Sequence, residues 1–244
     1  MIRTLYITIL SYFLVGGILF HIIGKKLTKE KARHNRIKFI VYFFIINGLF
    51  LSIVIKPLVF RILSGVIVVL GLYELLKLYL ASDRKKKGFF LFSLLLYLLL
   101  SVGFLYFSTL NKNWILFTFM ILSVLDSFSQ IFGQLFGKHQ IAKKISPGKT
   151  AEGLAGGTLT ALLTAVLIRK LIHFEMTTIL LLAAGVVIWA FLGDLAASAY
   201  KRKYGVKDFS KLIPGHGGIL DRFDSLIAAG AWMGLIGYLI LIAT

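Results

Sequence analysis

The chain has 244 residues, of which 58% are apolar and 16% are charged, and its formal net charge is +18. So few charged side chains cannot cover the surface of a water-soluble domain of this size. The composition therefore excludes an ordinary soluble protein and indicates an integral membrane protein. The absence of cysteine excludes disulfides, thiolate metal sites and thiol nucleophiles.

Runs of about twenty apolar residues recur along the chain, which is the length that a helix needs to cross a hydrocarbon core about 30 Å thick. The predicted spans are residues 4–23, 38–55, 58–80, 89–109, 113–137, 151–172, 176–199 and 219–243. The first run lacks a strongly basic start and a small-residue cleavage site, so we interpret it as a helix of the mature protein. No loop is long enough to fold alone. We therefore predict an all-α, polytopic integral membrane protein with about eight transmembrane helices, in which residues 1–244 form a single membrane domain.

Lysine and arginine are distributed unevenly between the connections. The connections 24–38, 81–88, 138–150 and 200–218 carry 20 of them, whereas the other connections and the termini carry 6. Because positively charged loops stay in the cytoplasm, we predict that these four lie inside and that both termini lie outside. The same charge suits an anionic lipid surface, so membrane lipids rather than nucleic acid are the expected partners.

The acidic residues divide the chain into two parts. Residues 1–112 are apolar helices with basic loops, and the isolated His21 and Glu74 are best explained as helix-end or inter-helix partners. Residues 113–244 hold seven of the ten acidic residues, and we interpret six of these as lying in or beside membrane segments: Asp126, Glu152, Asp194, Asp208, Asp221 and Asp224. Charges at membrane depth usually face a cavity, a partner or an ion, so we expect the functional helices and loops in this second part.

The stretch DSFSQIFGQLFGKH, residues 126–139, places small and polar residues at helical spacing. Asp126, Ser129, Gln130, Gly133, Gln134 and Gly137 fall on one helix face. Small and hydrogen-bonding residues are typical of contacts between membrane helices, which is one interpretation of the serine, the glutamines and the glycines. A carboxylate at this depth is expensive, so we predict a functional role for Asp126.

In KKISPGKTAEGLAGG, residues 143–157, a Pro-Gly pair interrupts the chain just before a predicted helix. The free amides and partial positive charge of a helix start can bind phosphate, and Lys149 and Ser146 would add to such a site. The alternative is that Thr150 only caps the helix. The stretch is no Walker A loop, because no glycine stands five residues before Gly148. The helix then carries three glycines that allow another helix to approach closely: Gly153, Gly156 and Gly157.

Asp194, in GDLAASAYKRK at 193–203, lies about six residues before the predicted cytoplasmic end of its helix, or about 9 Å at 1.5 Å per residue. Ser198 and Lys201 follow on the same helix face. The alternative to a functional role for Asp194 is an ion pair with a nearby cation.

The stretch PGHGGILDRFDS, residues 214–225, combines a tight glycine turn with two carboxylates where the last apolar run begins. Asp221 and Asp224 are three residues apart and share a helix face, so they repel each other unless a positive group lies between them. Mg²⁺ prefers such hard oxygen ligands together with water and phosphate, which predicts a magnesium site. Asp194 and Asp221 are expected at similar depth beneath one membrane face. His216 is more readily explained as a hydrogen-bond partner in the glycine turn than as a base.

Residues 198–225, SAYKRKYGVKDFSKLIPGHGGILDRFDS, closely resemble the signature of phosphatidate cytidylyltransferases, also called CDP-diacylglycerol synthases. FGKH at 136–139 and SPGKTAEG at 146–153 also look like that family, so the resemblance covers about residues 126–225. It implies a Mg²⁺-dependent transfer of a cytidylyl group from CTP to phosphatidic acid, which yields CDP-diacylglycerol and pyrophosphate. It also implies a homodimer in a bacterial plasma membrane, with the catalytic helices and the cytoplasmic active site in 113–244.

The resemblance assigns roles to individual residues. The expected metal ligands are Asp194 and Asp221, supported by Asp224 and Asp126. The expected catalytic residues are Asp194, Asp221, Lys149, Lys201 and Arg222. The expected substrate-binding residues are Ser146, Lys149, Lys201, Arg202, Lys207, His216, Gly217 and Gly218. Cations that surround the phosphates and hold them in line suffice for such a transfer, without a covalent nucleophile.

Departures from the family pattern leave other functions open. Where the family commonly reads G-D-x-x-E-S, this chain has GDLAAS, so Ala197 replaces a carboxylate, and a second cation and activity itself are both left open. Phe209-Ser210 replaces the usual Ser-Gly, and three larger residues, Ser127, Phe128 and Ser129, follow the upstream aspartate.

The alternatives are a CTP-dependent polyprenol or dolichol kinase, a CDP-lipid synthase for another lipid phosphate, an inactive homologue and a transporter. A lipid kinase would release CDP and a lipid phosphate rather than pyrophosphate. The absence of an internal repeat and the gathering of charges on one side disfavour a transporter.

Overall fold

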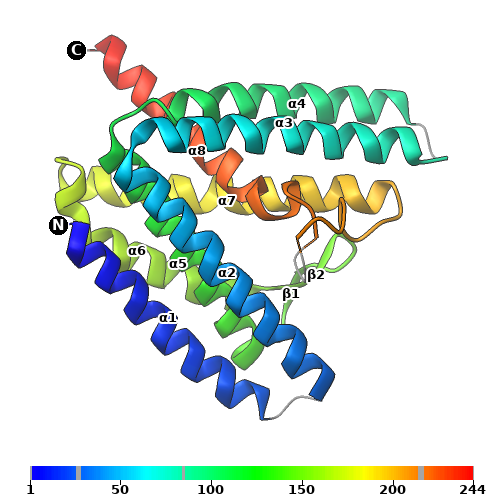
Figure 1. Cartoon of the computed structure of the whole chain (residues 1–244), viewed down its shortest axis with the longest axis horizontal. Helices are drawn as coiled ribbons and strands as arrows, with labels where there is room; N and C mark the ends of the chain where they lie inside the picture. Colours follow the sequence, from blue (N-terminus) through cyan, green and yellow to red (C-terminus); the bar gives the residue numbers. More distant parts are fainter. Residues whose placement is uncertain (1, 26–28, 84–85, 214–216, 244) are drawn as a thin grey trace.

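The computed structural model describes residues 2–25, 29–83, 86–213 and 217–243. Within these residues the chain forms eight α-helices, a β-hairpin and one 3₁₀ turn (Figure 1). The helices are α1 (Ile2–Gly24), α2 (Lys29–Ile55), α3 (Pro57–Ala81), α4 (Lys87–Phe107), α5 (Lys112–Phe136), α6 (Ala151–Leu167), α7 (Met176–Lys203) and α8 (Leu220–Ala243). The strands are β1 (Gln140–Ala142) and β2 (Ser146–Thr150), and the 3₁₀ turn is Arg169–Leu171.

The predicted class, an all-α polytopic membrane protein, is confirmed. Five helices, α3, α4, α5, α7 and α8, are long and apolar enough to cross a membrane. The other three contain shorter apolar stretches: Leu5–Leu19, Phe39–Ile55 and Ala151–Leu167. The number of membrane crossings, eight, and the location of both termini outside the cell therefore stay predictions.

Three helix ends differ from the predicted ones by four residues or more. α2 begins at Lys29, nine residues before the predicted start at 38. α7 continues to Lys203, because basic side chains in its last turn complement the negative end of the helix. Asp194 consequently lies nine residues from the end of α7, or about 14 Å at 1.5 Å per residue. α6 ends early, at Leu167, where the chain turns into the 3₁₀ segment.

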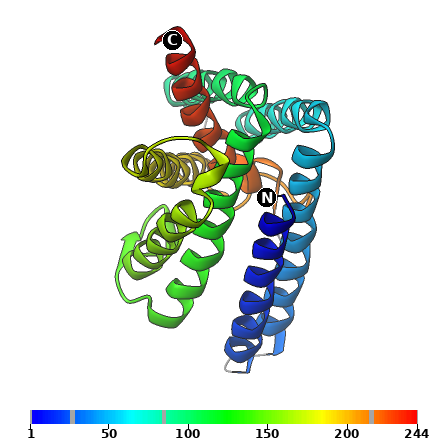
Figure 2. The ribbon, with the colours of Figure 1, turned by 90° about the vertical axis from the view of Figure 1, so that its left-hand side faces the viewer.

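Helix α5 is central to the packing, since it contacts α1, α2, α6, α7 and α8. In Figure 2, α1 lies beside α2 and α5 beside α6, while α3 and α4 form the upper part of the molecule. α8 crosses the molecule and packs against both α4 and α7. In this arrangement α5, α7 and α8, which carry most of the predicted site, adjoin one another.

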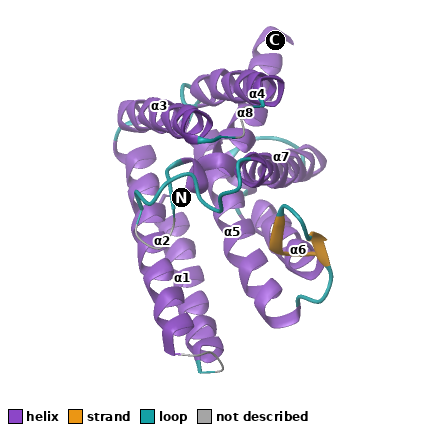
Figure 3. Ribbon diagram, turned by 90° about the vertical axis from the view of Figure 1, so that its right-hand side faces the viewer, coloured by secondary structure: helices purple, strands orange, loops and turns teal. Residues whose placement is uncertain are grey.

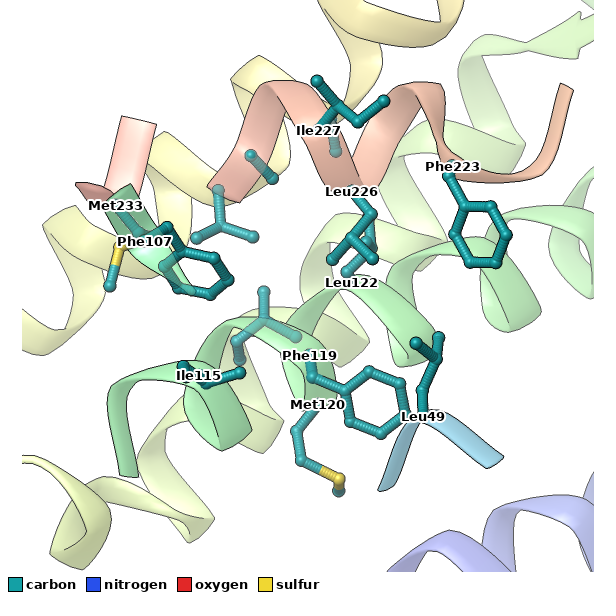
Figure 4. Close-up of a cluster of buried hydrophobic side chains, with 14 of the residues drawn as sticks. Leu49, Phe107, Ile115, Phe119, Met120, Leu122, Phe223, Leu226, Ile227 and Met233 are labelled. Atoms are coloured by element: carbon teal, nitrogen blue, oxygen red, sulfur yellow. The ribbon is translucent and has the colours of Figure 1, made fainter. Parts of the chain in front are cut away.

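The apolar core lies where α4, α5 and α8 meet (Figure 4). Phe107, Ile115 and Met233, one from each helix, are completely buried. Leu122 and Leu226 continue this contact toward the site. The core therefore holds the two helices that carry Asp126 and Asp224 in a fixed relation.

The hairpin is the one strand structure among the described residues, and we had expected a plain loop there. β1 and β2 pair antiparallel, with Ala142 opposite Ser146, and lie beside the start of α6 (Figure 3). The pairing satisfies backbone groups of a segment that has left the helix at Gly137. The hairpin thereby delivers Lys149 and Thr150 directly to the first turn of α6.

Candidate functional site

Two adjoining cavities lie between the helices. The larger cavity, about 370 Å³, has an apolar and aromatic wall from α1 and α2, made of Ile9, Tyr12, Phe13, Gly16, Phe39, Tyr42 and Ile46. Its polar wall consists of Asp126, Gln130, Asp194, Lys201, Asp208, Asp221, Arg222, Asp224 and Ser225. The smaller cavity, about 230 Å³, is lined by Gly148, Lys149, Thr150, Phe191 and residues of α5 and α6. Both cavities share Asp126, Gln130, Asp194 and Ser225, so they meet at these four side chains.

The start of α6 fixes one cation at this junction. The hydroxyl of Thr150 accepts a hydrogen bond from the N–H of Gly153 at 3.1 Å, so Thr150 does cap the helix. Lys149, one residue earlier, places Nζ 2.5 Å from Oδ2 of Asp194 and 4.8 Å from the centre of the Phe191 ring. Ser198 donates to Oδ1 of Asp194 at 3.1 Å. The cation that we considered as a partner for Asp194 is therefore Lys149.

Glu152 joins the two upstream motifs. Its carboxylate accepts hydrogen bonds from the backbone N–H groups of Lys138, at 3.0 Å, and His139, at 3.2 Å. The His139 ring adds a contact of 2.5 Å to the other carboxylate oxygen. FGKH and SPGKTAEG are separate in the sequence, but these contacts of Glu152 join them at the start of α6.

Glycines bring the carboxylates of three helices together. A methyl group at Gly193 would lie 2.8 Å from the carbonyl oxygen of Asp224, so only glycine lets α8 pack this closely beside Asp194. On α6, a methyl group at Gly157 would lie 2.9 Å from the carbonyl oxygen of Leu125, next to Asp126. The predicted role of Gly157 in close helix approach is confirmed. Because these glycines let the helix backbones pack closely, they set the distances between the acidic side chains.

Asp221 is held differently from the other carboxylates. Its side chain is only 2% exposed, and Oδ1 lies 2.5 Å from Nζ of Lys201. Its second oxygen, Oδ2, accepts from the N–H of Phe209 at 2.7 Å and from the N–H of Gly218 at 2.8 Å. Both oxygens of Asp221 are therefore engaged by protein donors.

The chemistry of these groups suits Mg²⁺, which prefers carboxylate oxygen, water and phosphate. Asp126, Asp194 and Asp224 line the larger cavity together, and the charge of Asp194 acts on both of the others. In the part of the chain that the structure describes, no three acidic or histidine side chains are already arranged around a common point. Substrate phosphates would have to complete such a metal site, so the predicted ligand set stays a prediction.

Some predicted substrate-binding residues lie outside both cavities. Arg202 donates to the backbone carbonyls of Ile145, at 3.1 Å, and Val206, at 2.9 Å, and so joins the hairpin to the end of α7. Ser146 belongs to β2, and the exposed Lys207 does not line either cavity. Of the glycine turn, Gly217 has a φ of 84°, a left-handed conformation that favours glycine. His216 lies outside the described residues.

Several lining residues were not singled out from the sequence. Tyr12, Phe13 and Tyr42 form the apolar wall, and nothing distinguishes them from other aromatic residues in apolar spans. Phe191 was likewise missed, although it neighbours a motif, whereas Ser225 is the last residue of the stretch PGHGGILDRFDS. Only their position in the folded chain assigns them to the site.

The fold and the site define a polytopic membrane protein that gathers carboxylates and lysines in a cavity between its helices. Residues 105–240 match the cytidylyltransferase family, and the chain belongs to that family of nucleotidyltransferases. The expectation drawn from the PGHGGILDRFDS region is thereby confirmed.

The similarity to curated relatives extends well beyond this region. The phosphatidate cytidylyltransferase of Staphylococcus epidermidis is 38% identical over 209 residues, which are 82% of this chain and 80% of that protein. Proteins of the same name from Staphylococcus saprophyticus and Staphylococcus aureus are each 33% identical, over 239 and 235 residues, and cover 91% of this chain. Because they cover 91% of this chain, these alignments also extend into the N-terminal helices, beyond the 126–225 region that carries the resemblance.

Proposed function

We propose that this protein is a CTP:phosphatidate cytidylyltransferase. In this reaction a phosphate oxygen of phosphatidic acid forms a bond to the α-phosphorus of CTP. The bond from that phosphorus to the β-phosphate oxygen breaks, and CDP-diacylglycerol and pyrophosphate are the products. The observation that carries the proposal is the meeting of two unlike cavities at Asp126, Gln130, Asp194 and Ser225.

The larger cavity suits the lipid. Its wall from α1 and α2 is apolar and aromatic, as acyl chains require, and its other end carries Arg222 and Lys201, which suit the lipid phosphate. The smaller cavity suits the nucleotide, because Lys149 and the first turn of α6 face it. The two phosphates would then meet at the shared carboxylates.

The protein's own groups would supply orientation and charge. Lys149 would leave Asp194 to contact the triphosphate, and Lys201 would act at the other side of the junction, where Asp221 holds it. Asp126, Asp194 and Asp224 would hold Mg²⁺, with Asp221 a ligand or the residue that positions Lys201. The bound metal would neutralise phosphate charge and orient the groups for in-line displacement. We also propose a homodimer in a bacterial plasma membrane, with the site at the cytoplasmic face.

The test uses the purified full chain with phosphatidic acid, Mg²⁺ and CTP labelled at the α-phosphorus. We expect the label in a CDP-lipid and an equal amount of pyrophosphate. Removal of Mg²⁺ with EDTA should abolish the reaction, and added Mg²⁺ should restore it.

The same assay separates the alternatives. Release of labelled CDP with a polyprenol as acceptor would contradict the proposal and favour a lipid kinase. A series of lipid phosphates as acceptors identifies the substrate, and absence of product with all of them would indicate an inactive homologue.

A further inference from the structure

Glu74, in the N-terminal half of the chain, accepts three hydrogen bonds from the signature region. Its side chain is buried, with 3% of the residue exposed, in the membrane-spanning helix α3. None of the ion pairs between described residues includes Glu74. A buried carboxylate without a cation must be stabilised by hydrogen bonds instead.

Three donors supply that stabilisation. Oε1 of Glu74 accepts from the hydroxyl of Ser210 at 2.7 Å and from the N–H of Ile219 at 3.0 Å. Oε2 accepts from the N–H of Leu220 at 2.8 Å. The last two groups belong to the start of α8, where N–H groups lack partners within the helix. Glu74 thus caps a helix from 145 residues away in the sequence.

This cap lies directly beside the predicted site. Leu220 is followed by Asp221, and Asp224 comes one turn later, with both aspartates lining the larger cavity. Gly218 packs against Glu74 so closely that a methyl group there would overlap both carboxylate oxygens. The segment before α8 is therefore held from two sides, by Glu74 and by Asp221.

From these contacts we infer that Glu74 is a positioning residue for the reaction, through the first turn of α8. Its carboxylate fixes the height and rotation of that turn, and so directs Asp221, Arg222 and Asp224 into the cavity. The inference rests on the proposed cytidylyl transfer, since the positioned groups act there. Glu74 itself lines neither cavity, so its role is to position other groups.

Glu74→Gln tests this role with little change in volume. All three partners are donors, so in either orientation the amide NH₂ faces a backbone N–H of α8. The expected result is a kcat about 10- to 100-fold lower, as for small misplacements of catalytic groups, with KM for CTP and for phosphatidic acid within about threefold. Glu175→Gln, the same change at an exposed residue, is the matched control and should leave kcat, KM and Tm unchanged.

A second variant approaches the contact from the other side. Gly218→Ala should displace the Glu74 carboxylate and lower kcat similarly, and the double variant should lose little more than either single one. Full additivity of the two effects would overturn the inference. An unchanged kcat in Glu74→Gln would also overturn the inference. A loss of activity that is fully explained by the fraction of unfolded protein would do the same.

If Glu74→Gln does not fold, Glu74→Asp decides, because it keeps the charge and shortens the side chain by one methylene. A folded Glu74→Asp protein with lowered kcat supports the inference, and one with full kcat contradicts it. Wild-type activity is measured in the same experiment. Its absence would refute the proposed function, whereas normal activity in every variant would refute only the role of Glu74.

Discussion

The acidic side chains of this protein differ in what neutralises them, and this difference separates their tasks. Asp194 has a single lysine and a serine as partners, and its side chain remains 34% exposed toward the cavities. Asp221 is saturated by Lys201 and two backbone N–H groups. Lys149 can therefore leave Asp194 and bind a phosphate instead. Asp221, in contrast, uses both oxygens to hold Lys201 and the segment before α8.

Asp221→Asn should leave the protein folded but inactive. Each oxygen of Asp221 accepts at least one hydrogen bond, so an amide in either orientation places its NH₂ against a donor. Lys201 also loses its counterion. We expect a loss of activity on the order of 100-fold or more, together with faster tryptic cleavage after Lys207 and Lys211. Unchanged cleavage with full activity would contradict the role of Asp221.

Lys149→Met should reduce kcat by about 100-fold, because it removes a cation aimed at the junction of the cavities. The matched control is Lys144→Met, which removes an exposed lysine from the turn of the same hairpin. It should leave the initial rate of CDP-lipid formation unchanged. Equal effects of both variants would mean that the hairpin contributes only general positive charge.

At the scale of the helices, close backbone contacts at glycine positions determine where the carboxylates lie. α5 and α6 approach through Gly133, Gly153 and Gly157, and α7 approaches α8 through Gly193. In a membrane, van der Waals contact and hydrogen bonding drive such packing, because the lipid is as apolar as the side chains. The interpretation of Gly133, Gly153 and Gly157 as helix contacts is thereby confirmed for the described structure, whereas Gly193 was not singled out from the sequence.

Gly157→Ala should destabilise the protein although alanine favours helices. The added methyl would lie 2.9 Å from backbone atoms of Leu125 and Ser129, and overpacking of this kind costs about 1–3 kcal/mol. Gly65→Ala is the control, because nothing lies within 4 Å of the new methyl group. It should stabilise by up to about 1 kcal/mol. Thermal unfolding in detergent measures both, and a lower Tm for Gly65→Ala than for Gly157→Ala would contradict the packing.

At the scale of the whole molecule, the fold places a larger cavity with one aromatic and one charged wall beside a smaller cavity that contains Lys149, and the two cavities meet at four shared residues. The aromatic wall comes mainly from α1 and α2, the side with Lys149 from the hairpin and α6, and the shared residues from α5, α7 and α8. A water-soluble nucleotide and a membrane lipid need such an arrangement, since neither enters the other's medium.

Because the chain has no cysteine, single thiols can report which substrate fills which cavity. Gly16→Cys places a thiol in the larger cavity, where Phe39 is 3.7 Å from the new Cβ, and Leu154→Cys places one in the smaller cavity. We expect phosphatidic acid to protect the first from a small thiol reagent, and CTP to protect the second. Lys144→Cys should react at the same rate with either substrate present. If CTP instead protected the thiol in the larger cavity and phosphatidic acid the thiol in the smaller one, the two cavities would have to be assigned to the opposite substrates.

The sequence by itself determined the membrane class and the family, because these depend on composition, run length and local motifs. It also named the acidic and basic residues that line the two cavities, together with Arg202 and Lys207, which do not. It also gave the cap at Thr150 as one of two interpretations and predicted the close approach at Gly157, which are short-range consequences of residue type. Only the tertiary structure decided that Lys149 faces Asp194, that Lys201 faces Asp221 and that Glu74 caps α8. Those partners come from different elements, and no pattern within one helix specifies which face of another helix packs against it.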